Sequence, residues 1–347
     1  MLLHSFDDLV RTMRSFQASR ILLTAVELDV FTAVGAGATG AQAAAKLGAG
    51  ARSTEMLLNA LAALGALTKA GDVFHNTPVT ARHLVAGSPE YARPELMHTV
   101  NLWSSWTTLT ECVRADTAVL PPGIDGREEE WTRSFIAAMH SNARTRAGEM
   151  VRAAGAERVR RLLDIGGGSG AYSIAFAQAN PNLRAEVFDL APVLAIAREH
   201  IAGAGLAGRI STRSGDLRTD EFGAGYDLIL LSAICHMLSA GENRDLLRRC
   251  GRALAPGGRV LIRDFILDPG RTSPVPAALF ALNMLVATRG GSTYTLAEYT
   301  AWLEEAGFGG VERPDPAGDL ITAGLQTRQD AAKVRAESAD STKYTLS

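Results

Sequence analysis

Helical periodicity dominates the first part of the chain. Residues 53–67, STEMLLNALAALGAL, carry apolar side chains at helical spacing, which predicts a buried helix N-capped by Ser53. Its buried face would consist of Met56, Leu57, Ala60, Leu61 and Leu64. Two short apolar runs around Ala70-Gly71-Asp72 predict a hairpin after that helix. Helices followed by a hairpin indicate a mainly helical, winged-helix-like domain over residues 1–90.

Residues 91–155 are predicted to be helices that link the two halves and line a substrate pocket. Residues 96–113 and 131–151 place aromatic and apolar positions at helical spacing, on either side of a Pro-Pro-Gly break. Trp103 and Trp106 lie in the first of these stretches. Either indole would close the pocket or serve only in packing.

From residue 161 onward, apolar strand-like runs alternate with helical stretches. This alternation predicts a Rossmann-like α/β fold, with a doubly wound, mostly parallel sheet covered on both faces. Two late strands are expected within residues 308–325, after a helix opened by the capping box Thr295–Glu298. The last strand is expected to be antiparallel. The domain would span residues 156–328. Residues 329–347 are polar and aperiodic, a composition typical of disorder.

Composition narrows the function classes. A chain of 347 residues exceeds the roughly 150 residues of a typical domain, so two domains are expected. A net charge of −2 disfavours nucleic acid and anionic membranes as partners. Three cysteines at scattered positions indicate neither a disulfide framework nor a zinc site, which favours the cytoplasm. The apolar run at residues 21–34 is interrupted by Glu27 and Asp29, so a buried helix is expected there rather than a membrane segment.

A winged helix raises one function outside enzymology, a DNA-binding regulator that senses a metabolite. The recognition helix would be RSTEMLLNALAAL, in which Arg52 is the only cation. Binding to DNA rests largely on basic side chains against phosphates. The domain therefore reads better as an interaction or dimerisation module.

The stretch LLDIGGGSGAYSI, at the junction of the first strand and first helix of the α/β domain, predicts a nucleotide-cofactor site. Glycines let backbone amides and the helix N-terminus approach a ligand closely. Gly166, Gly168 and Ala171 also satisfy the dinucleotide pattern, and Asp189 ends the second strand where a ribose diol needs an acceptor. On these residues alone, NAD and S-adenosylmethionine both fit.

Three further features favour S-adenosylmethionine. Asp164, inside the strand end, would organise the loop or meet the methionine ammonium, whereas it would repel a pyrophosphate. Asp216, in SGDL, ends the third strand where it can accept from an adenine amino group. LAPGGRVLI, followed by the two late strands, is typical of methyltransferases. Together with LLDIGGGSG, VFDL and EYTAWLEEAGF, these motifs resemble, across nearly the whole chain, the class I S-adenosylmethionine-dependent methyltransferases.

Within that class the sequence is similar to the small-molecule O-methyltransferases of the plant caffeate and acetylserotonin type. The resemblance implies an N-terminal domain that forms an intertwined homodimer. It also implies cofactor contacts from Asp164, Gly166 and Gly168, from Asp189 and Leu190 at the ribose, from Asp216 and Leu217 at the adenine, and from Ser232 beside the methyl donor.

The stretch LLSAICHMLS resembles the family segment that carries a histidine base. His236 matches the base, and Met237 stands where the family has aspartate. The capping box Ser239–Glu242 opens a helix directly afterwards, so His236 is expected in a loop above the carboxyl end of the fourth strand, where ligands bind in such sheets. The nearby positive helix end favours the neutral imidazole that a base requires. The alternative is a histidine that is merely hydrogen-bonded in the core.

In the family two acidic residues assist the histidine. Asp264 matches the first, while Ser292, Thr293 and Tyr294 occupy the segment expected to hold the second. The prediction is methyl transfer to a hydroxyl of a small, aromatic metabolite, with His236 as base and Asp264 as its partner. Because of the departures, C-methylation and a non-methylating hydroxylation or rearrangement stay open as alternatives.

Substrate contacts are expected from the linking helices and from the stretch ALFALNMLVATRGGSTYT. The predicted residues are Met139, His140, Phe280, Asn283 and Met284, which suggest a mostly apolar pocket with one amide to orient a ligand. Leu279, Leu282 and Leu285 would equally suit a core. For His140 an ordinary helix position is favoured over a substrate contact or a metal triad with His236 and Asp264, and no metal is predicted.

Overall fold

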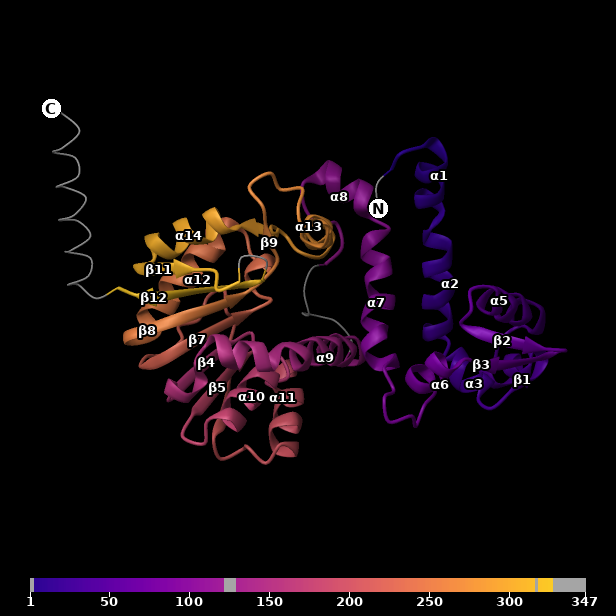
Figure 1. Cartoon of the computed structure of the whole chain (residues 1–347), viewed down its shortest axis with the longest axis horizontal. Coiled ribbons are helices and arrows are strands. Elements are labelled where there is room, and N and C mark those ends of the chain that lie inside the picture. The colour runs from indigo at the N-terminus through magenta and orange to yellow at the C-terminus, as the bar shows by residue number, and fades with distance from the viewer. Residues whose placement is uncertain (1–2, 122–128, 316–317, 327–347) are drawn as a thin grey trace. The chain divides into compact units, whose positions relative to one another are not determined.

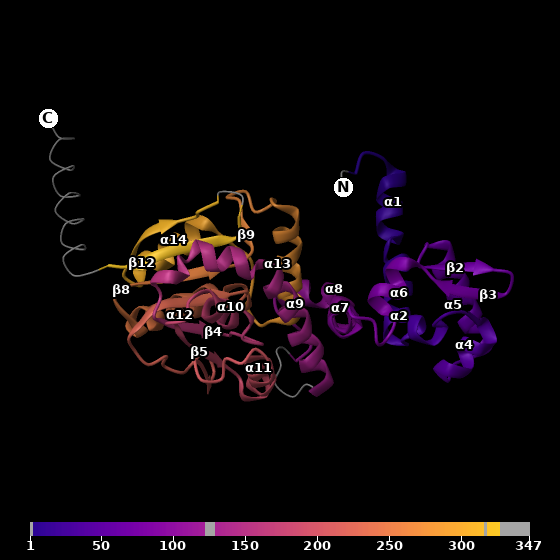
Figure 2. The same ribbon diagram turned by 60° about the horizontal axis from the view of Figure 1, so that its bottom comes forward.

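The computed structural model describes residues 3–121, 129–315 and 318–326. It divides into two compact units, which Figures 1 and 2 show. The first unit comprises Met1–Trp103 with Arg133–Ala138, and the second comprises Ser104–Thr132 with Met139–Ser347. The boundaries at residues 90, 155 and 328 remain predictions, and the tail over residues 329–347 lies outside the described residues. No described helix is long and apolar enough to cross a membrane.

The first unit combines short helices with a small antiparallel sheet of order β1-β3-β2. The predicted hairpin is confirmed: Ala70 pairs with Val73 across a turn at Gly71. The strands are β1 (Ala38–Thr39), β2 (Leu67–Ala70) and β3 (Val73–Asn76). The helices are α1 (Phe6–Arg14), α2 (Phe16–Glu27), α3 (Val30–Val34), α4 (Gly40–Leu47), α5 (Ala51–Ala63) and α6 (Pro78–Leu84).

Helix α5 corrects two expectations from the sequence. It begins at Ala51 with Gly50 as N-cap, and the Ser53 hydroxyl donates to the Gly50 carbonyl instead of capping the helix. Its buried residues are Thr54, Leu58 and Leu61, whereas Met56 is 57% exposed and Leu64 is 46% exposed. Helical spacing predicted the apolar stripe, but the core is centred on Leu58 and Leu61. Leu57 and Ala62 are half-buried against that core, whereas Met56 is on the surface.

The linking segment is helical, as predicted. It contains α7 (Arg93–Trp106), α8 (Leu109–Ala115) and α9 (Glu129–Ala153). The two tryptophans belong to different units: in the first unit Trp103 lies under the Arg20 guanidinium, 5.5 Å from its ring centroid. In the second, the Trp106 indole N–H donates to Asn283 Oδ1 over 2.9 Å.

The second unit is built on a seven-stranded sheet of order β11-β12-β8-β7-β4-β5-β6. Neighbours from β8 to β6 are parallel, while β12 is antiparallel to both β8 and β11, which confirms the predicted mostly parallel sheet with an antiparallel last strand. The strands are β4 (Arg161–Ile165), β5 (Arg184–Asp189), β6 (Ile210–Ser214), β7 (Tyr226–Ser232), β8 (Leu254–Arg263), β11 (Phe308–Glu312) and β12 (Leu320–Leu325). A separate parallel pair joins β9 (Ile266–Leu267) and β10 (Tyr294–Thr295).

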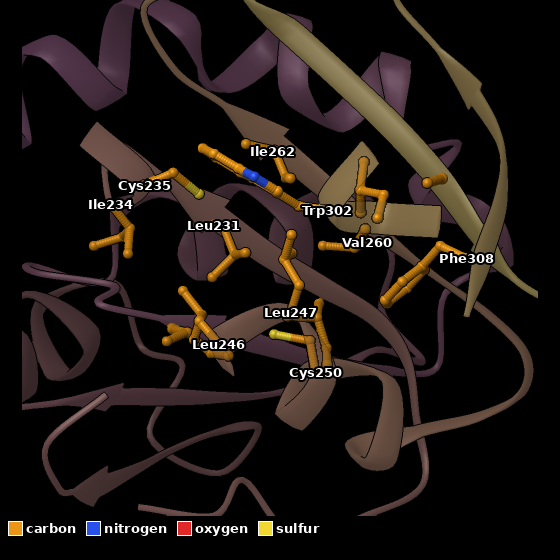
Figure 3. Packing of buried hydrophobic residues seen from close by; sticks show 14 of the residues in the cluster. Leu231, Ile234, Cys235, Leu246, Leu247, Cys250, Val260, Ile262, Trp302 and Phe308 are labelled. Atoms are coloured by element: carbon orange, nitrogen blue, oxygen red, sulfur yellow. The ribbon is translucent and has the colours of Figure 1, made fainter. Parts of the chain in front are cut away.

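Helices cover both faces of this sheet, α10 and α11 on one and α12 and α14 on the other (Figure 1). Leu231, Ile262 and Trp302 belong to the larger apolar cluster (Figure 3). The helical elements are η1 (Ala156–Arg158), α10 (Ala171–Ala179), α11 (Ala191–Gly203), η2 (Cys235–Met237), α12 (Ala240–Ala253), α13 (Val275–Ala287) and α14 (Leu296–Glu305). The strand order reverses between β4 and β7, so a crevice is expected at their carboxyl ends, where open α/β sheets bind ligands.

Candidate active site

The glycine loop connects β4 to α10 at the carboxyl edge of the sheet. Gly166 and Gly168 have φ angles of 65° and 56°, in the left-handed region that favours glycine. A Cβ on Gly166 would collide with the buried Ile234 side chain. Glycine at position 166 is therefore required both by its φ angle and by the packing of Ile234, which leaves the loop backbone without a side chain there.

Two carboxylates flank this loop, Asp164 buried and Asp189 half-buried. Asp164 accepts from the Ser173 hydroxyl over 2.8 Å, and Asp189 accepts from the backbone N–H groups of Gly168 and Leu190 over 2.8 and 2.7 Å. Burial raises the pKa of Asp189 to about 6, and burial together with the Asp189 charge raises the pKa of Asp164 to about 6. A bound cation or hydroxyl donor would favour the ionised forms. These carboxylates thus fit the ammonium and the ribose diol of S-adenosylmethionine.

The other predicted cofactor residues lie around the same edge. The Leu217 side chain is a neighbour of Gly166, and half-buried Ser232 ends β7 next to β4. Asp216 accepts from the Arg218 N–H over 2.8 Å, so its carboxylate shapes its own loop. Arg249, which is 3% exposed, was not predicted from the sequence. Its guanidinium donates to the carbonyl oxygens of Arg218 and Asp220 and so holds the loop that carries Asp216.

His140 lies beside the glycine loop. Its Nδ1 is 2.8 Å from the Ser169 hydroxyl, and its ring stacks on His200 of α11 with centroids 4.1 Å apart. Burial, with the charges of His200 and Arg144, lowers the pKa of His140 to about 4. Among the described residues no cluster of three or more His, Cys, Asp or Glu side chains is arranged to hold a metal ion. Within the described residues the structure thus brings His140 to Ser169 and His200, and not into a triad with His236 and Asp264.

His236 and Asp264 are joined by a short, buried polar contact. His236 Nδ1 lies 2.6 Å from Asp264 Oδ1, and both residues are at most 5% exposed. The carboxylate also accepts from the backbone N–H groups of His236 and Phe265 over 3.0 and 2.7 Å. Because the Asp264 carboxylate is an acceptor, Nδ1 is the ring atom that donates to it, and in the neutral imidazole the lone pair then belongs to Nε2. Nε2 has no hydrogen-bond partner among the described residues.

The loop that carries His236 is fixed from three directions. Asn243, fully buried, donates from Nδ2 to the carbonyl oxygens of Cys235 and Leu238 over 2.9 and 3.2 Å. The Tyr294 hydroxyl donates to the same Leu238 carbonyl over 2.5 Å. Gly291 passes so close that a Cβ there would collide with the His236 carbonyl oxygen. Neither Asn243 nor Tyr294 was predicted to hold this loop, because each acts through backbone atoms.

Ser292, Thr293 and Tyr294 occupy the segment where the family has a second acid, and two of them support the surrounding structure. Thr293 is fully buried and donates to the Ala277 carbonyl over 3.1 Å, so it supports α13. Ser292 is half-buried and makes only a long contact of 3.4 Å to the Thr293 carbonyl. Burial raises the pKa of Tyr294, which keeps its hydroxyl a donor. In this part of the described chain, loop support replaces a second acid.

Aromatic rings surround the imidazole. Phe280 meets His236 edge to face with centroids 4.8 Å apart, and Phe265 stacks on Phe280 at 3.9 Å. Phe265 was missed, although its position directly after Asp264 was a usable signal. Met284 is 5% exposed and Met139 is half-buried, and their substrate contacts stay predictions. Among the apolar side chains of α13, Leu279 is 57% exposed and Leu282 is 36% exposed, so neither belongs to the core of this chain.

Two known protein families match the chain. Residues 10–86 match an O-methyltransferase dimerisation domain, and residues 121–309 match an O-methyltransferase domain. The chain belongs to the O-methyltransferase family. As a member of this family it is an S-adenosylmethionine-dependent O-methyltransferase, so the dinucleotide alternative for the glycine loop and the regulator alternative both fall away.

This O-methyltransferase is similar to known proteins over most of their length. The chain is 37% identical over 317 residues to 3-hydroxy-5-methyl-1-naphthoate 3-O-methyltransferase of Streptomyces sahachiroi, which covers 89% of this chain and 92% of the relative. The structure of PigF with SAH superposes with a TM-score of 0.85 at 28% identity, covering 93% of this chain and 100% of PigF. Human N-acetylserotonin methyltransferase in complex with SAM gives a TM-score of 0.80 at 25% identity, with coverage of 93% and 98%.

Proposed function

We propose that this O-methyltransferase acts on a hydroxyl of an aromatic small molecule, with His236 as general base and Asp264 as its positioning residue. The observation that carries the proposal is the 2.6 Å hydrogen bond between His236 Nδ1 and Asp264 Oδ1. It fixes the tautomer in which Nε2 can accept a proton. The aromatic rings of Phe265 and Phe280 beside the imidazole support an aromatic acceptor.

The chemistry required of the protein is alignment and removal of one proton. S-adenosylmethionine, when bound, supplies a methyl group already activated on a sulfonium sulfur. His236 Nε2 takes the proton from the acceptor hydroxyl as its oxygen becomes nucleophilic, and the Asp264 carboxylate stabilises the resulting imidazolium. The proton passes to water when product leaves. A positioned base of this kind contributes typically about 10²–10⁴-fold.

The cofactor-binding roles of Asp164, Gly166, Gly168 and Asp189 belong to the same proposal. Their support is the bare loop and the two carboxylates described above, to which Tyr172 adds a buried hydroxyl without a hydrogen-bond partner among the described residues. Leu190, Asp216, Leu217 and Ser232 complete the proposed contacts. The fit is one of chemistry, an anionic pocket for a cationic ligand.

We also propose a homodimer formed through the first unit. The matched dimerisation domain supports it, as do apolar side chains exposed on the first helices, with Phe6 76% and Met13 69% exposed. Met56 and Leu64 on α5 extend this exposed apolar set. We place the enzyme in the cytoplasm, in keeping with its three unpaired cysteines.

The proposed function is tested by product identification. Enzyme incubated with methyl-labelled S-adenosylmethionine and a panel of phenols, enols and α-keto acids should place the label on the oxygen of an aromatic hydroxyl. NMR of the product distinguishes a methyl ether from a C- or N-methyl group. Label found only on carbon or nitrogen, or a product oxidised without label, would refute O-methylation of a phenol.

Cofactor binding should weaken at acidic pH. In the free protein Asp164 and Asp189 both have a pKa of about 6, so each becomes protonated as the pH falls through that value. A bound ammonium or hydroxyl favours the carboxylate, so binding must expel the proton, and the Kd rises by up to about tenfold per pH unit per carboxyl below pH 6. Calorimetry with S-adenosylhomocysteine from about pH 8 to about pH 5 measures this, and Asp164→Asn should flatten the curve. A constant Kd across that range would contradict the assignment.

A further inference from the structure

His140 joins three elements of the second unit at the glycine loop. It lies in α9, and its Nδ1 atom is 2.8 Å from the hydroxyl of Ser169 in the loop. Its ring stacks on His200 of α11, with centroids 4.1 Å apart and an interplanar angle of 16°. Helix α11 begins directly after Leu190, at the end of β5. The imidazole thus contacts the loop through one edge and the helix after β5 through one face.

Ser169 depends on this contact for its hydrogen bonding. The residue is 3% exposed, and among the described residues its hydroxyl has no hydrogen-bond partner other than His140. A buried hydroxyl that loses its partner keeps the full cost of its desolvation. Removal of the imidazole nitrogen should therefore favour conformations in which Ser169 leaves its buried position.

Ser169 is also the point at which a side chain can anchor the loop. Residues 166–170 read GGGSG, so Ser169 alone among them has a side chain. The Gly168 N–H donates to Asp189 Oδ2 and the Gly170 N–H donates to the Gly167 carbonyl, each over 2.8 Å. Glycine has the largest conformational freedom to lose when a loop becomes ordered. A side-chain anchor between two glycines therefore has a large effect on how ordered this loop is before a ligand arrives.

We propose that His140 is a positioning residue for cofactor binding: its imidazole, braced by His200, holds Ser169 so that the glycine loop keeps the conformation that receives S-adenosylmethionine. The inference rests on the proposed role of this loop in the cofactor site. It adds a residue that acts through Ser169, from a helix outside the strand-loop-helix motif.

The charge state of the ring suits this role. Burial, with the charges of His200 and Arg144, lowers the pKa of His140 to about 4, so the imidazole is neutral at neutral pH. A neutral imidazole has one donor and one acceptor nitrogen, and a hydroxyl can both donate and accept. Ser169 can therefore pair with Nδ1 in either tautomer.

Three variants separate the hydrogen bond from the ring stack. His140→Phe keeps a ring against His200 and removes Nδ1, whereas His140→Asn removes the ring and keeps a polar atom bonded to Cγ, as Nδ1 is. Ser169→Ala removes the hydroxyl itself. The Kd for S-adenosylhomocysteine is measured by calorimetry at about pH 8, where the Asp164 and Asp189 carboxyls are ionised. His140→Phe and Ser169→Ala should each raise the Kd by about three- to tenfold, while His140→Asn should stay close to the wild type.

Two further measurements tie the effect to this one contact. The double variant His140→Phe/Ser169→Ala should bind no more weakly than either single variant, because both substitutions remove the same hydrogen bond. Hydrogen exchange of the backbone over residues 165–170 should be faster than in the wild type for free His140→Phe and Ser169→Ala, and unchanged for His140→Asn. If His140→Phe does not fold, Ser169→Ala and His140→Asn carry the same test.

Asn142→Ala, at an exposed position of the same helix, is the matched control and should keep the wild-type Kd. Wild-type binding by Ser169→Ala, additive losses in the double variant, or a loss in His140→Asn as large as that in His140→Phe overturns the inference. No binding of S-adenosylhomocysteine by the wild type would overturn the cofactor assignment together with it. If the variants differ as expected and no O-methylated product forms with any acceptor, the proposed function fails and the role of His140 stands.

Discussion

His236→Ala is expected to lower kcat by about 10²–10⁴-fold while the Kd for S-adenosylhomocysteine stays unchanged. The side chain provides the imidazole Nε2 beside Phe280, whereas the carboxylates proposed to hold the ammonium and ribose of the cofactor come from β4 and β5. Without the base, only acceptor molecules whose hydroxyl has already ionised in water can react. The rate of the variant should therefore climb with pH toward the phenol pKa of about 10. Single-turnover rates across pH, together with calorimetry, measure both effects.

Asp264→Asn sharpens the same test. An amide in place of the carboxylate faces three N–H donors with only one acceptor oxygen, so its own N–H group must oppose one of them. If the amide donates to His236 Nδ1, the proton moves to Nε2, and the imidazole can no longer act as base. A large loss of kcat with unchanged cofactor Kd is expected here too. His83→Ala, which removes an exposed histidine of the first unit, is the control; full activity of His236→Ala would end the case for the base.

The sequence predicted elements best where one local signal decides them. The strands RAEVFD and YDLILLS begin and end where their apolar runs do, and both capping boxes open α12 and α14 as expected. Such runs and caps depend on neighbouring residues alone. Helix α5 shows the limit of this approach, because spacing cannot say which side of an apolar stripe a core will cover. Met56 and Leu64 lie on the uncovered side.

The candidate site divides in the same way. Asp264 was assigned to His236 from a resemblance, and the structure brings their side chains together from β7's following loop and the end of β8. For His140 an ordinary helix position was favoured over a substrate contact, and the structure adds a contact to Ser169 of the glycine loop. No pattern in the sequence indicated this contact, because the direction of the side chain depends on how α9 meets the sheet. The roles of Asn243 and Tyr294 could not be predicted, because a hydrogen bond to the carbonyl of a residue elsewhere in the chain produces no recognisable pattern in the sequence. Their contribution is visible only in three dimensions.

Gly291→Ala should lower kcat by about 10²-fold with little change in the Kd for cofactor. A Cβ at this position would collide with the His236 carbonyl oxygen, and it would lie 2.6 Å from Thr288 Oγ1 and 3.0 Å from the Met237 carbonyl carbon. Two of these atoms are backbone, so no change of rotamer relieves the overlap and the His236 loop must move. A displacement of about 1 Å can cost about 10²-fold in rate.

The hydrogen bonds that hold the His236 loop are the reason that Gly291→Ala should affect turnover and not cofactor binding. Asp264, Asn243 and Tyr294 hold the His236 segment in place, so the added methyl group pushes against hydrogen bonds that themselves position the base. Gly241→Ala is the matched control, because it adds the same methyl group nearby in α12 with nothing within 4 Å. It should keep wild-type kcat and melting temperature. If Gly291→Ala binds S-adenosylhomocysteine normally and also turns over at the wild-type rate, the position of His236 does not limit the reaction, and the base must be sought elsewhere.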